Sequence, residues 1–383
     1  MRKLFIVIVL VSTVAAGIAV FFYNRLPQPQ PNKEQLQADF ENAKDAFEQD
    51  VADSHSTYAE LLSIEQYLDS LTKRQKAGSL FMVNIFGSSL TDDAKQLIKR
   101  NHPGGIIMMS GNIIGPLQLS SLISDVRSST DYELLIAVDQ EGYPVARVGW
   151  EKYADSNTAK LGESSTPKEI AAIYSSRSKQ LANLGFDINF APVADIAFPN
   201  SWITDRAFSS DAEEVAKILT AIFKEAVPKG VEQCAKHFPG LGRSDIDSHA
   251  ELPVIAADKN ELLDTDILPY KSIISEGAQM IMVGHAKYPN LDKGRPASVS
   301  KTIQTDILRD ELGFNGVIVS DDMKMGALNN VENRYAKAVL AGTNIVVLID
   351  TYDQIDAAVT QVSTQIDETI LEERLRKTLK TLY

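Results

Sequence analysis

Charged side chains follow one short apolar segment after another in this chain, and their types suit acid–base and nucleophilic chemistry. These residues are Asp139, Asp195, Lys236, His237, His285, Asp321 and Asp322. A buried strand has little structural use for a charge at its end, apart from a single ion pair or the cap of a following helix. Because the pattern recurs along the chain, we predict that these side chains share one active site.

Two adjacent aspartates end the apolar segment Gly316–Ser320. Neighbouring residues of a strand point to opposite faces, so only one of the two carboxylates can point into a site. We predict that Asp321 is this residue and that it acts as a nucleophile. Asp322 is then expected to cap the helix that follows, since aspartate is a favoured N-cap residue.

An Asp–His pair, Asp247 and His249, lies on a segment that Pro239, Gly240 and Gly242 mark as an irregular loop. A carboxylate beside an imidazole orients the ring and fixes its tautomer, and an imidazole can both donate and accept a proton near neutral pH. The alternative is a metal site formed by the histidines and nearby carboxylates. No His-x-x-x-His spacing supports that alternative, so we expect no metal and no cofactor.

The apolar segments that position these residues are rich in Val, Ile and Met, and they alternate with segments of helical character. The predicted strands are Ser79–Phe86, Gly104–Met109, Leu134–Val138, Asp187–Val193, Glu232–His237, Ala278–His285, Gly316–Ser320 and Thr343–Leu348. The clearest helical segments are Pro167–Leu184, Asp211–Val227 and Asn260–Ser275. Continuous apolar strands that alternate with helices predict a parallel sheet. About eight such units over ~300 residues predict an α/β fold, a closed (β/α)8 TIM-type barrel. In such a barrel the active site lies at the carboxyl ends of the strands. An open doubly wound sheet is the alternative, but no Gly-rich phosphate motif follows the first strand.

An uncharged run of mostly apolar residues, Leu4–Tyr23, follows Arg2 and Lys3 near the start of the chain. About twenty helical residues span the ~30 Å hydrocarbon core of a bilayer. We therefore predict that residues 1–26 form a single-pass transmembrane helix that anchors an extracytoplasmic catalytic domain in the cell membrane. A cleaved signal peptide, which would release a secreted protein, is the alternative. Residues 27–70 are predicted to be a linker and helical stalk, and residues 71–383 the single catalytic domain.

Composition narrows the choice of partners. The net charge of −13 argues against nucleic acid, because a phosphate backbone requires a basic surface. The single cysteine, Cys234, excludes a disulfide within the chain and a Cys-based zinc site. It lies in an apolar run, so we expect it to be a small core residue.

The order of these motifs resembles that of the family 3 glycoside hydrolases, in particular the bacterial β-N-acetylhexosaminidases, between about Leu71 and Leu348. The matching segments are Asp139-Gln-Glu-Gly142, Phe190-Ala-Pro-Val193 with Asp195, Asp205-Arg206 with Phe208, Lys236-His-Phe-Pro-Gly240 with Asp247-Ser-His249, and Ser320-Asp-Asp322. Two positions depart from the family pattern: Leu241 stands where a His is usual, and Tyr143-Pro144 where Gly-Arg is usual. Neither is a catalytic position, but both affect the edge of the expected sugar pocket.

The resemblance implies a retaining exo-β-N-acetylglucosaminidase that removes terminal β-linked GlcNAc. It implies that Asp321 is the nucleophile, that Asp247 and His249 form the acid/base dyad, and that the sugar is held by Asp139, Arg147, Arg206, Lys236 and His237. A β-glucosidase, a glycoside phosphorylase or a non-catalytic glycan-binding relative on the same barrel is the alternative. Wall fragments, chitin fragments and glycoconjugate ends all carry this sugar, and an extracytoplasmic location favours peptidoglycan turnover.

Overall fold

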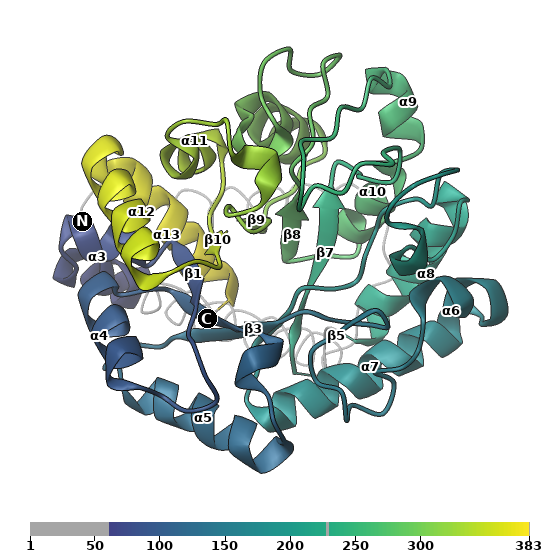
Figure 1. Cartoon of the computed structure of the whole chain (residues 1–383). Coiled ribbons are helices and arrows are strands. Elements are labelled where there is room, and N and C mark those ends of the chain that lie inside the picture. Colours follow the sequence, from purple (N-terminus) through teal and green to yellow (C-terminus); the bar gives the residue numbers. More distant parts are fainter. Residues whose placement is uncertain (1–60, 227–229, 383) are drawn as a thin grey trace, which may run out of the picture. The chain divides into compact units, whose positions relative to one another are not determined.

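The computed structural model describes residues 61–226 and 230–382, and Figure 1 shows their arrangement. Residues from Ile64 onward form one compact unit. Within it, residues 64–70 are helical, and Ile64 and Leu68 pack in the core. The predicted anchor and the linker as far as residue 60 lie outside the described residues. Across 61–226 and 230–382, no helix has the length and apolar character needed to cross a membrane.

Parallel strands form one eight-stranded sheet that curves around the centre of the molecule (Figure 1). The strands are β1 (Phe81–Asn84), β2 (Gly105–Met108), β3 (Leu135–Val138), β6 (Ile188–Asn189), β7 (Glu232–Phe238), β8 (Met280–Val283), β9 (Val317–Ser320) and β10 (Val346–Leu348). Their order is β10-β1-β2-β3-β6-β7-β8-β9, and a parallel bridge between Val319 and Ile345 brings the two ends of the sheet together. The predicted (β/α)8 TIM-type barrel is therefore confirmed, and the open doubly wound sheet is wrong.

One predicted strand, Asp187–Val193, is only partly formed, because β6 ends at Asn189. Pro192 has no N–H group to donate to the sheet. Val193 returns to the sheet through an isolated bridge to Lys236. This irregular exit carries the chain across the end of β7 and places Asp195 there.

Helices surround the barrel (Figure 1). They are α3 (Lys73–Gly78), α4 (Asp92–Asn101), α5 (Pro116–Ser128), α6 (Thr158–Ser164), α7 (Pro167–Leu184), α8 (Ala212–Glu225), α9 (Lys259–Asp264), α10 (Leu268–Ser275), the π-helix η5 (Thr302–Glu311), α11 (Arg334–Ala341), α12 (Tyr352–Gln365) and α13 (Glu368–Leu382). Short 3-10 helices are η1 (Ser110–Asn112), η2 (Thr204–Arg206), η4 (Ala297–Val299) and η6 (Gly326–Leu328), and an antiparallel hairpin consists of β4 (Gln140–Gly142) and β5 (Val145–Ala146).

Local sequence signals set the ends of these helices. The hydroxyl of Thr166 forms a capping box with Glu169 at the start of α7, and Gly185 ends that helix in the left-handed conformation at φ 99°. The predicted helix Asn260–Ser275 is instead two helices, α9 and α10. Pro269 lies in the first turn of α10, where its missing N–H costs no hydrogen bond, whereas the interior of one long helix would not tolerate it.

Apolar side chains fill the barrel interior. They include Met82, Ile107, Ala137, Phe190, Cys234, Met280, Val317 and Val347. Cys234 is fully buried, and burial raises the pKa of its thiol well above the ordinary value, as befits an unreactive core residue. Because the interior is packed with apolar groups, charged side chains are accommodated at the strand ends.

Candidate active site

The carboxyl ends of neighbouring strands bring most of the predicted side chains to one region. Asp139 follows β3, Asp195 follows β6, Lys236 and His237 lie near the end of β7, His285 follows β8, and Asp321 follows β9. Arg147, directly after β5, and Arg206, in η2 between β6 and α8, reach the same region through their contacts with Asp139 and Glu141. The contacts among these side chains decide what each can do.

Lys236 and Arg206 are bound by two carboxylates. The Nζ atom of Lys236 lies 2.7 Å from Oδ1 of Asp139 and 2.7 Å from Oε1 of Glu141. The guanidinium of Arg206 donates two hydrogen bonds of 2.9 Å to the same Glu141 carboxylate. Glu141 belongs to the matching motif Asp139-Gln-Glu-Gly142, but it was not among the predicted site residues. It is the residue that joins the two cations, and it is almost completely buried.

The charged groups of this network, Asp139, Glu141, Arg206 and Lys236, are largely buried. Burial by itself would raise the pKa of Glu141, but Arg206 and Lys236 outweigh burial and hold that pKa well below its usual range. Burial would lower the pKa of Lys236, yet Asp139 and Glu141 keep it above the ordinary value. The network therefore stays ionised at neutral pH and presents fixed, charged hydrogen-bonding groups to a ligand.

His237 is oriented by Asp195, which is completely buried. Oδ2 of Asp195 lies 2.7 Å from Nδ1 of His237 and accepts the backbone N–H of His237 at 3.3 Å, while its Oδ1 accepts the N–H of Leu241 at 2.6 Å. Nδ1 therefore carries a proton, and Nε2 lies 4.0 Å from Oδ2 of Asp321 and 3.4 Å from Nη2 of Arg206. Asp195 thus aims the imidazole at the predicted nucleophile.

Asp321 lies directly beyond β9 with 18% of its side chain exposed. Its Oδ1 accepts the N–H of Asp322 at 2.8 Å, which leaves Oδ2 on the side of His237. Burial would raise the pKa of Asp321, but His237, His285 and Lys236 together lower it below the ordinary value. The carboxylate is therefore ionised at neutral pH, as a nucleophile has to be.

The predicted role of Asp322 as a helix cap is wrong. After β9 the chain enters a turn and the short η6, and α11 begins only after Asn333. Oδ1 of Asp322 instead accepts the N–H groups of Lys324 and Ile349, both at 3.0 Å, and so ties β9 to the end of β10. Burial raises the pKa of Asp322 to about 6. Its carboxylate is thus committed to the backbone.

His285 is a structural group. Nδ1 lies 2.7 Å from the hydroxyl of Ser298, and Nε2 lies 3.0 Å from the carbonyl oxygen of Asp322. The carbonyl can only accept, so Nε2 carries the proton and Nδ1 accepts from Ser298. Burial lowers the pKa of His285. The ring holds the backbone next to Asp321 in place.

The Asp–His pair is present on the loop after β7. Nδ1 of His249 lies 2.7 Å from Oδ1 of Asp247, and that oxygen also accepts the backbone N–H of His249 at 2.9 Å. Nδ1 is therefore protonated and the other nitrogen, Nε2, is left for proton exchange. Of the two side chains, 64% and 48% are exposed, so the pair is open to solvent.

The loop that carries this pair contacts the segment that follows Asp321. The N–H of Gly326 donates to the carbonyl of His249 at 2.9 Å, and the N–H of Ala327 donates to the carbonyl of Ser248 at 3.2 Å. No hydrogen bond or ion pair among the described residues joins the pair to Asp321 itself. The backbone contacts therefore hold the loop of the dyad next to the segment that follows the nucleophile.

Trp202 is a neighbour of the dyad that the sequence did not reveal. Its ring lies edge-to-face against His249, with centroids 6.0 Å apart and an interplanar angle of 88°. On the segment between β6 and α8 it precedes Arg206, whose guanidinium lies 5.5 Å from the indole. The Asp205-Arg206 motif next to it was the available signal, but an isolated Trp carries no pattern of its own.

Arg147 lies beside Asp139, and the two positions that depart from the family pattern, Leu241 and Tyr143, differ in their exposure to solvent. Nη2 of Arg147 lies 4.0 Å from Oδ2 of Asp139, and its Nε is buried with no hydrogen-bond partner in the described part of the chain. Leu241 is fully buried and packs in the apolar core. Tyr143, between β4 and β5, is 58% exposed, so this departure alone changes the surface.

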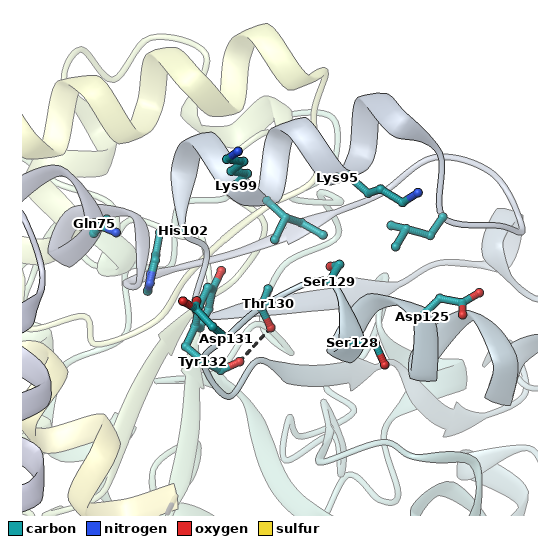
Figure 2. A pocket seen from close by; sticks show the side chains of 12 residues that line it. Gln75, Lys95, Lys99, His102, Asp125, Ser128, Ser129, Thr130, Asp131 and Tyr132 are labelled. Carbon is teal, nitrogen blue, oxygen red and sulfur yellow. Dashed lines mark hydrogen bonds between the residues drawn. The ribbon is translucent and has the colours of Figure 1, made fainter.

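A separate groove of about 880 Å³ lies between α4 and α5 and contains none of the predicted site residues. Figure 2 shows Lys95 and Lys99 on one side and Ser128 to Tyr132 on the other. In the ranges 61–226 and 230–382, no group of three or more His, Cys, Asp and Glu side chains is arranged to hold a metal ion.

An ionised aspartate and a solvent-facing Asp–His pair at the strand ends of a (β/α)8 barrel can supply the nucleophile and the acid/base of a glycoside hydrolase. Residues 72–381 match the Glycosyl hydrolase family 3 N terminal domain. The chain belongs to this family and is a glycoside hydrolase.

Relatives of known identity include a β-hexosaminidase of Nitrosomonas eutropha, which is 33% identical over 295 residues, covering 73% of this chain and 83% of the relative. The structure of a family 3 β-N-acetylglucosaminidase from Paenibacillus sp. str. FPU-7 has a TM-score of 0.78 at 29% identity and covers 82% of this chain. This chain spans 62% of that enzyme, less than two thirds of its length. NagZ from Neisseria gonorrhoeae, solved in complex with N-trifluoroacetyl-D-glucosamine, has a TM-score of 0.67 at 28% identity over 79% of this chain and 90% of its own.

Proposed function

We propose that this chain is a retaining exo-β-N-acetylglucosaminidase that removes terminal β-linked GlcNAc through a covalent glycosyl-enzyme on Asp321. The observation that carries the proposal is the pairing of an ionised carboxylate at the end of β9 with the Asp247–His249 pair on the neighbouring loop. The β-hexosaminidase relatives support the sugar, and so does the GlcNAc analogue bound to the Neisseria enzyme.

The charged network would hold the sugar. Asp139 and Glu141 can accept hydrogen bonds from hydroxyl groups, and Lys236 and Arg206 can donate them. All four groups are already fixed by one another, so they bind without losing much conformational freedom. His237 adds a hydrogen-bonding nitrogen next to Asp321.

In the first step, Nε2 of protonated His249 gives its proton to the glycosidic oxygen while Oδ2 of Asp321 attacks the anomeric carbon. The bond from this carbon to the leaving-group oxygen breaks, and an ester bond to Asp321 forms. Asp247 keeps its hydrogen bond to Nδ1 of His249 throughout and stabilises the imidazolium before the transfer.

In the second step, the now neutral Nε2 of His249 takes a proton from water as the water oxygen attacks the anomeric carbon. The ester bond breaks, the carboxylate of Asp321 is restored, and GlcNAc leaves with retained configuration. One imidazole serves as acid and then as base, because the same nitrogen can donate a proton and then accept one.

The test compares kcat/KM for an aryl β-GlcNAc glycoside and the matching β-glucoside. We expect a clear preference for the GlcNAc substrate. A ratio at or below one would overturn the assignment and favour a β-glucosidase, whereas turnover of neither substrate would favour a non-catalytic glycan-binding relative. Product analysis with and without inorganic phosphate separates hydrolysis from phosphorolysis, since a phosphorylase would release GlcNAc 1-phosphate.

We infer a location as well: the catalytic domain is extracytoplasmic and is held at the cell membrane by Leu4–Tyr23. The length and apolar character of that run support this placement. An enzyme in this position would meet peptidoglycan fragments, which carry β-linked GlcNAc, and wall turnover is the proposed role.

A further inference from the structure

We propose that Trp202 is a positioning residue that holds the imidazole of His249 in the orientation needed for proton transfer. The proposal rests on the acid/base role proposed above for His249. It assigns to the indole a task that neither the catalytic groups nor the sugar-holding network performs.

His249 needs a second contact because Asp247 cannot fix the dyad alone. Both residues lie on the same loop, with 64% and 48% of their side chains exposed. Their mutual hydrogen bond fixes the tautomer, but the two side chains could still rotate together. A general acid must lie within hydrogen-bonding reach of the leaving oxygen, so a contact from outside the loop is required to fix its direction.

Trp202 supplies this contact from a different segment of the fold. The rings of Trp202 and His249 form an edge-to-face pair with centroids 6.0 Å apart, a geometry that aromatic pairs favour.

The indole is itself well fixed. Its neighbours in sequence, Ser201 and Ile203, are buried, and its backbone N–H donates to the carbonyl of Ser244 at 3.1 Å. The indole Nε1 is buried and has no hydrogen-bond partner among the described residues. The ring is therefore placed by packing.

Arg206 fixes the indole from the substrate side. Its guanidinium lies 5.5 Å from the centre of the Trp202 ring and makes two hydrogen bonds to the buried Glu141. Trp202 thus connects the rigid sugar-holding network to the exposed acid/base. A side chain in this place can set the position of His249 relative to a bound sugar.

The first test uses the full-length Trp202→Ala and Trp202→Phe variants with two β-GlcNAc glycosides that differ in their leaving group. Dinitrophenolate leaves without a proton, whereas a poor leaving group such as an alkyl alcohol requires one. For Trp202→Ala we expect kcat on the poor substrate to fall about 10- to 100-fold, a part of the 10²- to 10⁴-fold worth of general acid catalysis, with little change in KM. The dinitrophenyl substrate should be affected far less, and Trp202→Phe should restore much of the loss.

The ratio of the kcat values for the two substrates is independent of the fraction of correctly folded enzyme, because both kcat values are measured on the same active molecules. Trp150→Ala, which changes the one other tryptophan of the chain, is the matched control and should leave the ratio unchanged. An equal rise of KM for both substrates would show that Trp202 acts through Arg206 on sugar binding, and would overturn the proposal. An unchanged ratio of the two kcat values in Trp202→Ala would also overturn it.

The second test observes the contact without catalysis. A Trp150→Phe variant retains Trp202 as its single tryptophan, which can be excited selectively over the tyrosines. A protonated imidazole accepts an electron from an excited indole and quenches it, whereas the neutral ring does not. In acidic solution we expect Trp202 fluorescence to rise when His249 is also replaced by Ala, because the quenching imidazole is then removed from the indole. Unchanged fluorescence overturns the proposal, and the result holds even if the wild type hydrolyses no β-GlcNAc glycoside.

Discussion

Individual residues of one type take different tasks here because their surroundings differ. Asp321 keeps one oxygen free and is held ionised by neighbouring positive charge. Asp322, its neighbour, is committed to two backbone N–H groups. Asp195 is committed to His237 and Leu241. Both oxygens of Asp195 are engaged, and two backbone N–H groups hold Oδ1 of Asp322. Asp321 turns its Oδ2 toward His237 and is the carboxylate on which the nucleophile prediction rests.

The first residue-scale prediction concerns Asp321. Asp321→Ala should abolish turnover of every glycoside substrate, because no covalent intermediate can form. In the wild type, a 2-fluoro sugar with a good leaving group should form a stable adduct, and mass spectrometry of the digested protein should locate it on the peptide that contains Asp321. An adduct on the peptide of Asp139 or Asp195 instead would refute the mechanism. Participation of the substrate's own acetamido group would then be the alternative to examine.

A second prediction separates His249 from the nucleophile. His249→Ala should reduce kcat for a poor leaving group by about 10²- to 10⁴-fold and should do much less harm with dinitrophenolate. Asp247→Asn should give an intermediate loss, because the imidazole is present but poorly oriented. If His249→Ala reduced kcat equally for both leaving groups, another group would be the acid.

At the scale of elements, β7 shows how an irregular strand builds a site. Residues next to each other in a regular strand face opposite ways. Lys236 and His237 nevertheless both reach the site, because the pairing of β7 with β8 shifts register between Ala235 and Phe238. The regular part of β7 sends Cys234 into the core. The break in pairing near its end is what allows two polar neighbours to serve one site.

The opposite end of β7 leads to a stability prediction. Glu232 begins the strand, its Oε1 is buried without a partner in the described part of the chain, and burial raises its pKa to about 7. Because the pKa of Glu232 is higher in the folded than in the unfolded protein, the folded state binds its proton more tightly. This stabilisation of the folded state is present below pH 4.5 and is lost as the pH rises through about 7. We therefore expect Glu232→Gln to be more stable than the wild type at pH 8. The difference in free energy of unfolding between the variant and the wild type should be about 2 kcal/mol larger at pH 8 than at pH 5.

Thermal unfolding at the two pH values measures this difference directly. Subtracting the variant from the wild type removes the effect of other titrating groups. The exposed Glu163, replaced by Gln, is a suitable control and should show no such pH dependence. An equal difference between wild type and Glu232→Gln at pH 5 and pH 8 would show that Glu232 does not resist ionisation.

At the scale of the whole molecule, barrel closure brings the two ends of the catalytic domain together. β1 pairs with β10, and Lys76 of α3 lies 2.7 Å from Glu368 and 2.6 Å from Glu372 of α13. Because the sheet closes, residues as far apart in sequence as Asp139 and Asp321 belong to one rim. The closed barrel also places the whole site at one end of the domain.

The prediction at this scale concerns location. The full-length chain should pellet with membranes, and protease added to intact cells should remove the catalytic domain. Deletion of residues 4–23 should abolish the membrane fraction, because that run supplies the apolar length needed to span a bilayer. Recovery of the full-length protein from the cytoplasm would overturn both the anchor and the proposed role at the wall.

The sequence by itself determined the strands, the barrel and the positions of the charged strand ends. These are local properties, since apolar runs alternate with helical segments and a polar residue after a buried strand is visible without any partner. The Asp247–His249 contact was predictable for the same reason, because the two residues are only two positions apart. The split of the predicted helix Asn260–Ser275 at Pro269 was also within reach, since proline is a local signal.

Only the tertiary structure decided which groups work together. Glu141 contacts Arg206 from 65 positions away, and Lys236 contacts Asp139 from 97 positions away. Asp322 binds Ile349 across two strands in place of the predicted helix cap. Trp202 lies against His249 from another loop. Burial, charge compensation and ring packing depend on partners that the chain brings together only when the barrel closes, so no pattern along the sequence could reveal them.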